Sequence, residues 1–301
     1  MNEVVRPMVD PGRDELVNRL FHLPTDRVCD CRPNNLGCSS AKDWARSQIV
    51  VWKFWVNGKD TGARKIHPAT FPIALPSKII SLFSHKGELV LDPFVGSGST
   101  LVAAQNLERS AIGFDLQKKY VDYSNGRLGP RNFLHPELRQ VAIMEDCRNA
   151  SRWIRPESVK LILTSPPYSN MLMVKRKNKS LRVRRNNKLG RVEQYSDDPR
   201  DLGTMDIEKY EEAIREIFVS LHPLVMTGGQ VLINVSDFSS GGERILVHVS
   251  TINATRKAGF RLKNIIIWDK TNLMNRIGIF GYPSNFLAMG AYEFILHFEK
   301  L

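Results

Sequence analysis

A glycine-rich segment and a proline-rich segment carry the residue types best suited to ligand chemistry. The first, residues 92–100, reads DPFVGSGST and directly follows a short apolar run. Gly96 and Gly98 let the backbone turn tightly and approach a ligand closely. A helix that begins after them offers free N–H groups and a positive dipole end, which suit a carboxylate or a phosphate. The segment is not a Walker loop, because no Gly-Lys-Ser/Thr follows, and it lacks the third glycine of the dinucleotide fingerprint.

Acidic residues at the ends of three successive apolar runs predict a nucleoside pocket. Asp92, Asp115 and Asp146 each close such a run. The carboxyl ends of parallel strands meet at one edge of a sheet, where ligands bind. There, Asp115 can accept hydrogen bonds from both hydroxyls of a ribose, and Asp146 can accept one from an adenine amino group. Each acid alone is equally well an ordinary strand-end cap, whereas the three together favour a bound nucleoside.

The proline-rich segment, residues 164–168, reads TSPPY and follows another apolar run. Pro166 and Pro167 remove two backbone N–H donors and restrict their neighbours to extended conformations, so that rigid carbonyl acceptors remain. Such acceptors suit an amino group. Ser165 adds a hydroxyl, and Tyr168 adds an aromatic face on which a base can stack. The alternative is a rigid turn between a strand and a loop.

Net charge and one basic segment indicate a polyanionic partner. The chain has 43 Lys and Arg against 31 Asp and Glu, which gives a net charge of +12. Such an excess favours nucleic acid. Residues 175–191 hold nine basic residues and no acid, directly after the proline-rich segment. The alternative for this segment is a solvated surface loop. The members that we expect to contact nucleic acid are Lys175, Arg176, Lys177, Arg182, Arg184, Arg185 and Lys188.

Three of the four cysteines lie close together in the N-terminal region. Cys29, Cys31 and Cys38 occur in CDCRPNNLGC, and His22 lies upstream. Three thiols and an imidazole can hold a structural zinc ion. The C-x-C-x6-C spacing is not that of a standard zinc knuckle, however, so a loop with free thiols is the competing interpretation. Cys147 stands alone and is expected to be a small core side chain.

Short apolar segments that alternate with amphipathic segments must position these residues. Strands are expected over residues 88–92, 111–115, 141–145, 160–164, 230–235, 262–268 and 292–298, and a further strand-like run covers 49–56. Helices are expected over residues 14–21, 72–84, 99–107, 118–128, 207–221 and 243–258. This alternation predicts βαβ units and a parallel sheet covered on both faces, with ligands at the carboxyl ends of the strands.

Length and composition limit the class of protein. The chain has 301 residues, of which 42% are hydrophobic and 25% charged, as in ordinary soluble globular proteins. It has no apolar stretch of about 18 to 20 residues, the length that spans a membrane. Its first residues lack the apolar core of a signal peptide. We therefore expect a cytoplasmic protein with no membrane partner.

The glycine-rich segment and TSPPY together resemble the amino-group DNA methyltransferases that use S-adenosylmethionine. SPPY resembles the cytosine-N4 branch, because adenine-N6 enzymes more often carry Asp or Asn before the two prolines. Supporting stretches are His67-Pro68 to Phe71-Pro72, Gly113 to Asp115, Glu145-Asp146, Tyr195 to Gly203, Trp268 to Lys270 and Tyr292 to Phe294. The resemblance implies catalytic roles for Ser165, Pro166, Pro167 and Tyr168. It implies cofactor binding by Phe71, Asp92, Pro93, Phe94, Gly96, Gly98, Ser99, Thr100, Asp115 and Asp146.

The resemblance also implies an α/β, Rossmann-like methyltransferase fold with a seven-strand mixed sheet, helices on both faces and an antiparallel last strand. We expect residues 48–301 to form the catalytic domain, with a basic DNA-recognition insertion at about 171–203, and residues 1–47 to form an extension that contacts DNA. In many SPPY enzymes the proline-rich segment precedes the cofactor segments, whereas here it follows them, as in a circularly permuted member. No separate recognition domain is visible, so the insertion, the extension and residues 271–291 must share that work.

The function implied by the resemblance is transfer of a methyl group to N4 of cytosine in double-stranded DNA, with the target base flipped out of the helix and no metal required. We expect a monomer or homodimer in a restriction-modification or similar defence system, with a cognate restriction endonuclease as a cellular partner. The alternatives are an adenine-N6 DNA methyltransferase, an RNA amino-methyltransferase and an inactive DNA-binding subunit.

Overall fold

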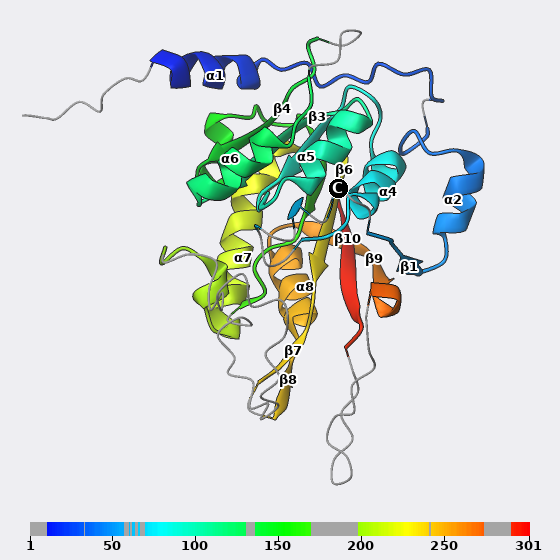
Figure 1. The fold of residues 1–301 in the computed structure, drawn as a ribbon, viewed down its shortest axis with the longest axis vertical. Coiled ribbons are helices and arrows are strands. Elements are labelled where there is room, and N and C mark those ends of the chain that lie inside the picture. Colours follow the sequence, from blue (N-terminus) through cyan, green and yellow to red (C-terminus); the bar gives the residue numbers. More distant parts are fainter. Residues whose placement is uncertain are drawn as a thin grey trace, which may run out of the picture.

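The computed structural model describes residues 11–32, 34–56, 60, 62–63, 66, 70–130, 136–169, 198–240, 242–273 and 290–301. These residues form a mixed sheet with helices on both faces (Figure 1). The sheet has eight strands in the order β1-β9-β10-β6-β5-β2-β3-β4. Their bounds are β1 (Val51–Lys53), β2 (Leu89–Asp92), β3 (Ser110–Asp115), β4 (Gln140–Met144), β5 (Val159–Thr164), β6 (Val225–Val235), β9 (Phe260–Asp269) and β10 (Tyr292–Lys300).

The pairing confirms the predicted fold class and corrects one detail. Strands β2 to β6 are parallel to one another, and β10 is antiparallel to both of its neighbours, as expected for the last strand. The prediction of seven strands was wrong, because β1 adds an eighth at the edge, parallel to β9. β1 comes from the strand-like run at residues 49–56, of which only three residues pair.

Seven α-helices are described, and five of them cover the sheet. Their bounds are α1 (Pro11–Phe21), α2 (Ala41–Ser47), α4 (Ala74–Phe83), α5 (Ser99–Asn106), α6 (Lys118–Gly126), α7 (Ile207–Leu221) and α8 (Val247–Lys257). Short 3-10 helices cover Cys147–Arg152, Leu202–Thr204, His222–Leu224 and Thr271–Leu273. In β2, Leu89 and Leu91 face the core that contains α7 and α8, whereas Val90 faces the core that contains α4 and α5. This alternation places one hydrophobic core on each face of the sheet.

Helix α7 shows how local sequence sets an element. Asp206 caps it by accepting a hydrogen bond from the Lys209 N–H at 2.9 Å. Tyr210, Ile214 and Phe218 recur at four-residue spacing and are fully buried. The predicted range of 207–221 is the observed one. The predicted helix over 243–258 begins later, at Val247, because its first residues form β8 (Glu243–Ile245), which pairs in a hairpin with β7 (Phe238–Ser240).

The described part of the expected N-terminal extension, within residues 1–47, packs against the sheet and its helices. Leu20 in α1 and Leu23 after it are each 3% exposed and belong to the core that contains α7. Arg155 donates a hydrogen bond to the Leu23 carbonyl at 3.4 Å, and the Val28 N–H donates one to the Lys86 carbonyl at 2.8 Å. Arg155 precedes β5 and Lys86 precedes β2, so these contacts lie at the amino ends of the strands (Figure 1). None of the described helices is long and apolar enough to cross a membrane.

Candidate active site

A cavity lies where the carboxyl ends of β2, β3, β4 and β5 meet, at the edge opposite the described part of the N-terminal extension. The space between its walls, about 960 Å³, includes the solvent-filled mouth of the cavity. It brings together the predicted cofactor-binding residues Phe71, Pro93, Phe94, Gly96, Ser99, Asp115 and Asp146 with the predicted catalytic residues Ser165, Pro166, Pro167 and Tyr168. The glycine-rich and proline-rich segments therefore line one site.

The glycine-rich turn connects β2 to α5 through two residues with positive φ. The φ angles are 47° for Gly96 and 78° for Gly98, in the region that favours glycine. A Cβ atom on Gly98 would lie 2.1 Å from Ser124 Oγ of α6, so a larger residue would push the two helices apart. Gly98 is also the N-cap of α5 and has no side chain to cap it. The first N–H groups of α5 thus lack a capping side chain and remain suited to a ligand.

Asp92 holds the turn in place and does not line the cavity. It is 1% exposed. Its Oδ1 accepts hydrogen bonds from Thr164 Oγ1 at 2.7 Å and from the Phe94 N–H at 3.1 Å, which ties β2 to β5. Burial raises the pKa of Asp92 to about 6. Gly98 and Thr100, which were also predicted to bind the cofactor, are likewise absent from the described cavity wall.

Asp115 faces the cavity at the end of β3 and already anchors the backbone on both sides. Its Oδ2 accepts a hydrogen bond from the Gly96 N–H at 3.1 Å, and its Oδ1 accepts one from the Gln117 N–H at 2.8 Å. Each carboxylate oxygen keeps a second lone pair, which is available to a ligand hydroxyl. Burial raises the pKa of Asp115 to about 6 despite these hydrogen bonds.

Asp146, at the end of β4, is held by arginines. Arg148 Nε lies 3.0 Å from Asp146 Oδ1, Arg148 Nη2 lies 2.8 Å from Oδ2, and Arg200 Nη1 lies 3.5 Å from Oδ2. Burial would raise the pKa of Asp146, but the hydrogen bonds from Arg148 outweigh it and hold the pKa below its usual value. Much of its acceptor capacity is therefore occupied, so a ligand amino group would share this carboxylate with Arg148.

A hydrogen-bond network fixes the proline-rich turn. Ser165 Oγ and Tyr168 Oη are 2.8 Å apart. Asn234 Nδ2, from β6, donates to Tyr168 Oη at 3.0 Å and to Glu293 Oε2 at 2.5 Å. Tyr168 Oη donates to Glu293 Oε2 at 3.3 Å, and Lys270 donates to Glu293 Oε1. Glu293 is 8% exposed, so the hydroxyls of Ser165 and Tyr168 connect to a buried carboxylate.

Some predicted residues cannot be placed, and some residues of the site were not predicted. Lys175, Arg176, Lys177, Arg182, Arg184, Arg185 and Lys188 lie outside the described residues. Residues that received no role from the sequence include Leu116, Gln117, Tyr120, Arg148, Arg200, Leu202 and Ile217 in the cavity wall, and Asn234, Lys270 and Glu293 behind it. Glu145 also lines the wall, and the Glu145-Asp146 stretch was part of the resemblance. Lys270 and Glu293 lie in two stretches whose sequence resembles that of the family. This resemblance was the only sequence evidence that pointed to them, and it did not indicate what either residue does.

The position of the cavity defines the class of the protein. A ligand site at the carboxyl ends of parallel strands, beside a glycine-rich turn that opens a helix, is typical of Rossmann-like nucleotide-binding domains. The antiparallel β10 within the otherwise parallel β10-β6-β5-β2-β3-β4 region is the mixed arrangement expected of the methyltransferase form. The chain belongs to the N6/N4 methyltransferase family described as DNA methylase, which it matches over residues 34–126 and 159–301. Membership confirms the resemblance to amino-group DNA methyltransferases and, with it, S-adenosylmethionine as the cofactor.

Individual relatives match over shorter stretches. The Type II methyltransferase M.HpaI of Haemophilus parainfluenzae is 41% identical over 26% of this chain and 25% of its own length. M.BglI of Bacillus subtilis is 48% identical over 20% of this chain and 17% of its own length. The matches thus span about a quarter or less of these relatives. Among solved structures, TrmN from Thermus thermophilus is 18% identical, with 72% of this chain and 45% of TrmN covered and a TM-score of 0.42.

Substitution of Asp115 by asparagine is expected to weaken binding of S-adenosylmethionine by about 1.5–3 kcal/mol, the value of hydrogen bonds to a charged group. Because ligand donors favour the ionised carboxylate, the affinity of the unaltered protein should also fall as the pH drops below about 6, the pKa of Asp115 in the free protein. The Asp115→Asn variant should lack this pH dependence. Calorimetric titrations between about pH 5 and 8 measure both effects.

The matched control is Asp122→Asn, which changes an exposed carboxylate of α6 that pairs with Lys118. It should leave both the affinity and its pH dependence unchanged. Equal affinities of the Asp115→Asn variant and the unaltered protein would exclude Asp115 from the cofactor site.

Proposed function

We propose that the protein transfers a methyl group from S-adenosylmethionine to the exocyclic N4 of cytosine in double-stranded DNA. The observation that carries the proposal is the single cavity that holds Ser165 of the SPPY turn, the glycine-rich turn and Asp115. The serine before the two prolines favours the cytosine-N4 branch over the adenine-N6 branch within the family. The lining of the cavity, with acceptors at Asp115 and Asp146 and an aromatic ring at Tyr168, suits a nucleoside cofactor next to one flipped base.

The chain offers donors and acceptors suited to each part of the cofactor. Asp115 would hold the ribose hydroxyls, the uncapped start of α5 and Gly96 would face the anionic carboxylate end, and Phe71 and Phe94 would supply apolar contacts. When bound, S-adenosylmethionine supplies an electrophilic methyl group. The protein's contribution is therefore mainly to position the target amine, an effect that can be worth about 7–11 kcal/mol.

The proline-rich turn would activate the amine. The nitrogen lone pair of cytosine N4 is delocalised into the ring, so the free amine is a poor nucleophile. Ser165 Oγ and the Pro166 carbonyl would accept hydrogen bonds from the two N–H groups and localise the lone pair on nitrogen. Transfer would form the N–C bond at the expense of the methyl–sulfur bond, whose electron pair stays on sulfur, and the surplus amino proton would pass to Ser165 Oγ. The network then offers a route through Tyr168 Oη, 2.8 Å away, to Glu293 Oε2, a further 3.3 Å away.

Nucleoside analysis of methylated DNA tests this proposal. Duplex DNA incubated with the purified chain and labelled cofactor should yield N4-methylcytosine after digestion. N6-methyladenine as the product would assign the adenine branch of the same family. Label in RNA but not in DNA would favour an RNA amino-methyltransferase, and DNA binding without turnover would favour an inactive subunit. We further propose that the protein acts in the cytoplasm beside a cognate restriction endonuclease, because two relatives are named Type II methyltransferases.

Neutralising part of the basic segment is expected to flatten the salt dependence of DNA binding. Each phosphate contact contributes about −0.9 to the slope of log K against log salt concentration. The variant Arg182→Gln/Arg184→Gln/Arg185→Gln should therefore lose up to about two to three units of slope. Cofactor affinity should stay constant, because the cavity is built from other residues. Titrations on cognate and scrambled duplexes measure the slope.

A second triple variant provides the control. Lys86, Arg261 and Lys263 lie near the amino ends of strands, at the edge opposite the cavity, and each pairs with a glutamate. Their replacement by glutamine removes the same charge and should leave the slope unchanged. Equal slopes for both triple variants would mean that the basic segment only adds net charge. If the basic-segment variant loses affinity for the cognate duplex alone, the segment contacts base edges as well as phosphates.

A further inference from the structure

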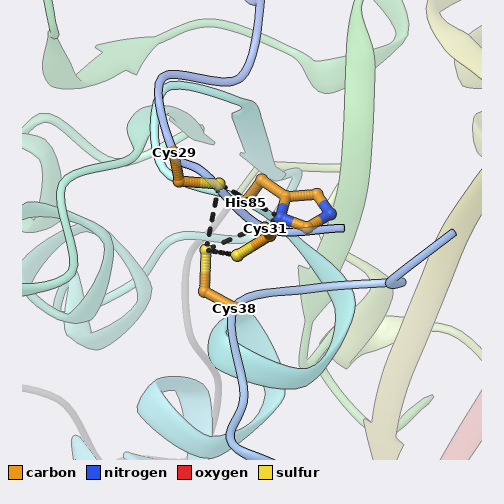
Figure 2. Close-up of side chains that lie close together, drawn as sticks. All are labelled: Cys29, Cys31, Cys38 and His85. Atoms are coloured by element: carbon orange, nitrogen blue, oxygen red, sulfur yellow. Dashed lines mark hydrogen bonds between the residues drawn. The ribbon is translucent and has the colours of Figure 1, made fainter. Parts of the chain in front are cut away.

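Four side chains that commonly bind metals converge at the amino-end edge of the sheet, away from the cavity. Cys29, Cys31 and Cys38 come from the N-terminal extension, and His85 is the second residue after α4 (Figure 2). Their ligand atoms all lie within 4.8 Å of one another. Residues separated by up to 56 positions in the chain thus present three sulfur atoms and one nitrogen atom to a common point.

Four of the six distances between the ligand atoms match those of a tetrahedral zinc site, and none of the six exceeds 4.8 Å. Cys38 Sγ lies 3.6 Å from both Cys29 Sγ and Cys31 Sγ, and His85 Nδ1 lies 3.3 Å from Cys29 Sγ and 3.6 Å from Cys38 Sγ. Zinc–sulfur bonds of about 2.3 Å and zinc–nitrogen bonds of about 2.0 Å at tetrahedral angles place sulfurs about 3.8 Å apart and sulfur about 3.5 Å from nitrogen. A disulfide would need about 2.05 Å, and all three thiols are free.

The imidazole of His85 is oriented for metal binding. Its Nε2 lies 2.9 Å from the Asn35 carbonyl, which can only accept, so Nε2 carries the proton and Nδ1 presents a lone pair to the sulfurs. A ligating histidine usually donates its other N–H in this way. The backbone is held as well, because the His85 N–H donates to Glu88 Oε2 at 2.6 Å and the Cys38 N–H donates to the Ser84 carbonyl at 3.2 Å.

A buried cation beside the cluster suits the charge of a metal-bound state. Three thiolates and one divalent ion carry a net charge of −1. Arg109 is 2% exposed and donates to the carbonyl and hydroxyl of Ser84, at 2.7 and 3.3 Å, and to the carbonyl of Leu107. These acceptors are neutral and do not balance the charge of the guanidinium. Since Ser84 directly precedes His85, a metal centre with a net charge of −1 would lie close to Arg109 and would stabilise its buried positive charge.

We propose that Cys29, Cys31, Cys38 and His85 bind one structural zinc ion, which fastens the N-terminal extension to the catalytic domain. Thiolate and imidazole ligands select zinc over calcium or magnesium, and four protein ligands leave no open position for catalysis. The fourth ligand differs from the one considered from sequence. His22 packs edge-on against Phe21, with ring centroids 5.6 Å apart, and is not part of the cluster.

Metal analysis of the full chain, purified without a polyhistidine tag from zinc-supplemented cells, tests the proposal. We expect about one zinc per chain and nearly complete loss of it in Cys31→Ser and His85→Ala. His85→Cys should retain the ion, since it restores a fourth ligand. His22→Ala and Cys147→Ala are the matched controls and should also retain it. If the serine variant does not fold, the loss of zinc in His85→Ala and its retention in His85→Cys and His22→Ala still test the ligand set.

A second measurement separates a metal from a packed thiol cluster. Reconstitution with cobalt should give the visible absorption of tetrahedral thiolate coordination, and removal of the metal should make residues 11–47 sensitive to protease before the rest of the chain. Zinc-free protein with titratable thiols, iron in place of zinc, or loss of zinc in His22→Ala but not in His85→Ala would each overturn the proposal. None of these readouts depends on methyl transfer.

Discussion

Replacement of Tyr168 by alanine is expected to lower kcat by about five- to 150-fold, the equivalent of about 1–3 kcal/mol for the loss of one base–aromatic stack. Tyr168 lines the cavity and is 6% exposed, with its hydroxyl fixed by Ser165 and Asn234. A ring held in this way is prepared to receive a flipped base without further ordering. Affinity for S-adenosylmethionine should remain nearly unchanged. Single-turnover methylation and cofactor calorimetry measure the two quantities.

The variant Tyr168→Phe separates the ring from the hydroxyl. It keeps the stacking face and loses the contacts to Ser165 and Glu293, so we expect a rate between those of the alanine variant and the unaltered protein. Tyr210→Phe is the matched control, because Tyr210 is buried in α7, its hydroxyl lies 3.1 Å from Thr251 Oγ1, and it does not line the described cavity wall. Its rate should not change. Wild-type turnover by Tyr168→Ala would place the target base elsewhere.

The parts of the fold that could be predicted are those set by local pattern. The range of α7 followed from its spaced apolar residues and from the break after it. The convergence of Asp115 with the glycine-rich and proline-rich turns followed from strand direction alone, because parallel strands end at the same edge. The bounds of strand β1 were harder to predict, because an edge strand of three residues depends on its partner β9 rather than on its own sequence.

The residues behind the proline-rich turn could not be predicted because strand register brings them there. Ile295 of β10 pairs with Asn234 of β6, and Glu293 pairs with Trp268 of β9. A slip of one residue would turn Glu293 to the other face of the sheet. Sequence spacing contains no information on this register, so Asn234 was not considered at all and Glu293 was noted only as part of a familiar stretch.

The charged partners of the acidic residues could not be predicted from the sequence either. Asp146 lies two residues before Arg148 in the sequence, but its pairing with Arg200 depends on how the segment after residue 197 returns to the cavity. The same holds for the cysteine cluster, whose imidazole comes from His85, 47 residues beyond Cys38, rather than from the nearer His22. Proximity in sequence identified the thiols but not their partner.

Replacement of Glu293 by glutamine is expected to lower kcat by about ten- to 150-fold, because charge-assisted hydrogen bonds of about 1.5–3 kcal/mol position the hydroxyls of Ser165 and Tyr168, which we propose to act in catalysis. The carboxylate accepts from Asn234, Tyr168 and Lys270, and a glutamine side chain replaces one of its acceptor oxygens with a donor. Tyr168 and Ser165 would then lose their common anchor. Since Glu293 does not line the described cavity wall, KM for DNA and affinity for the cofactor should change much less than kcat.

The matched control lies on the same strand. Glu299 of β10 forms half-exposed ion pairs with Arg261 and Lys263, at 2.8 and 3.1 Å, and pairs of this kind contribute about 0–1 kcal/mol. Glu299→Gln should therefore preserve both kcat and the melting temperature. Glu293→Asp, which keeps the charge on a shorter stem, should recover part of the rate lost in Glu293→Gln. If Glu293→Gln lowers the melting temperature but methylates at the unaltered rate, the carboxylate serves only stability, and the proton route from Ser165 through Tyr168 must be abandoned.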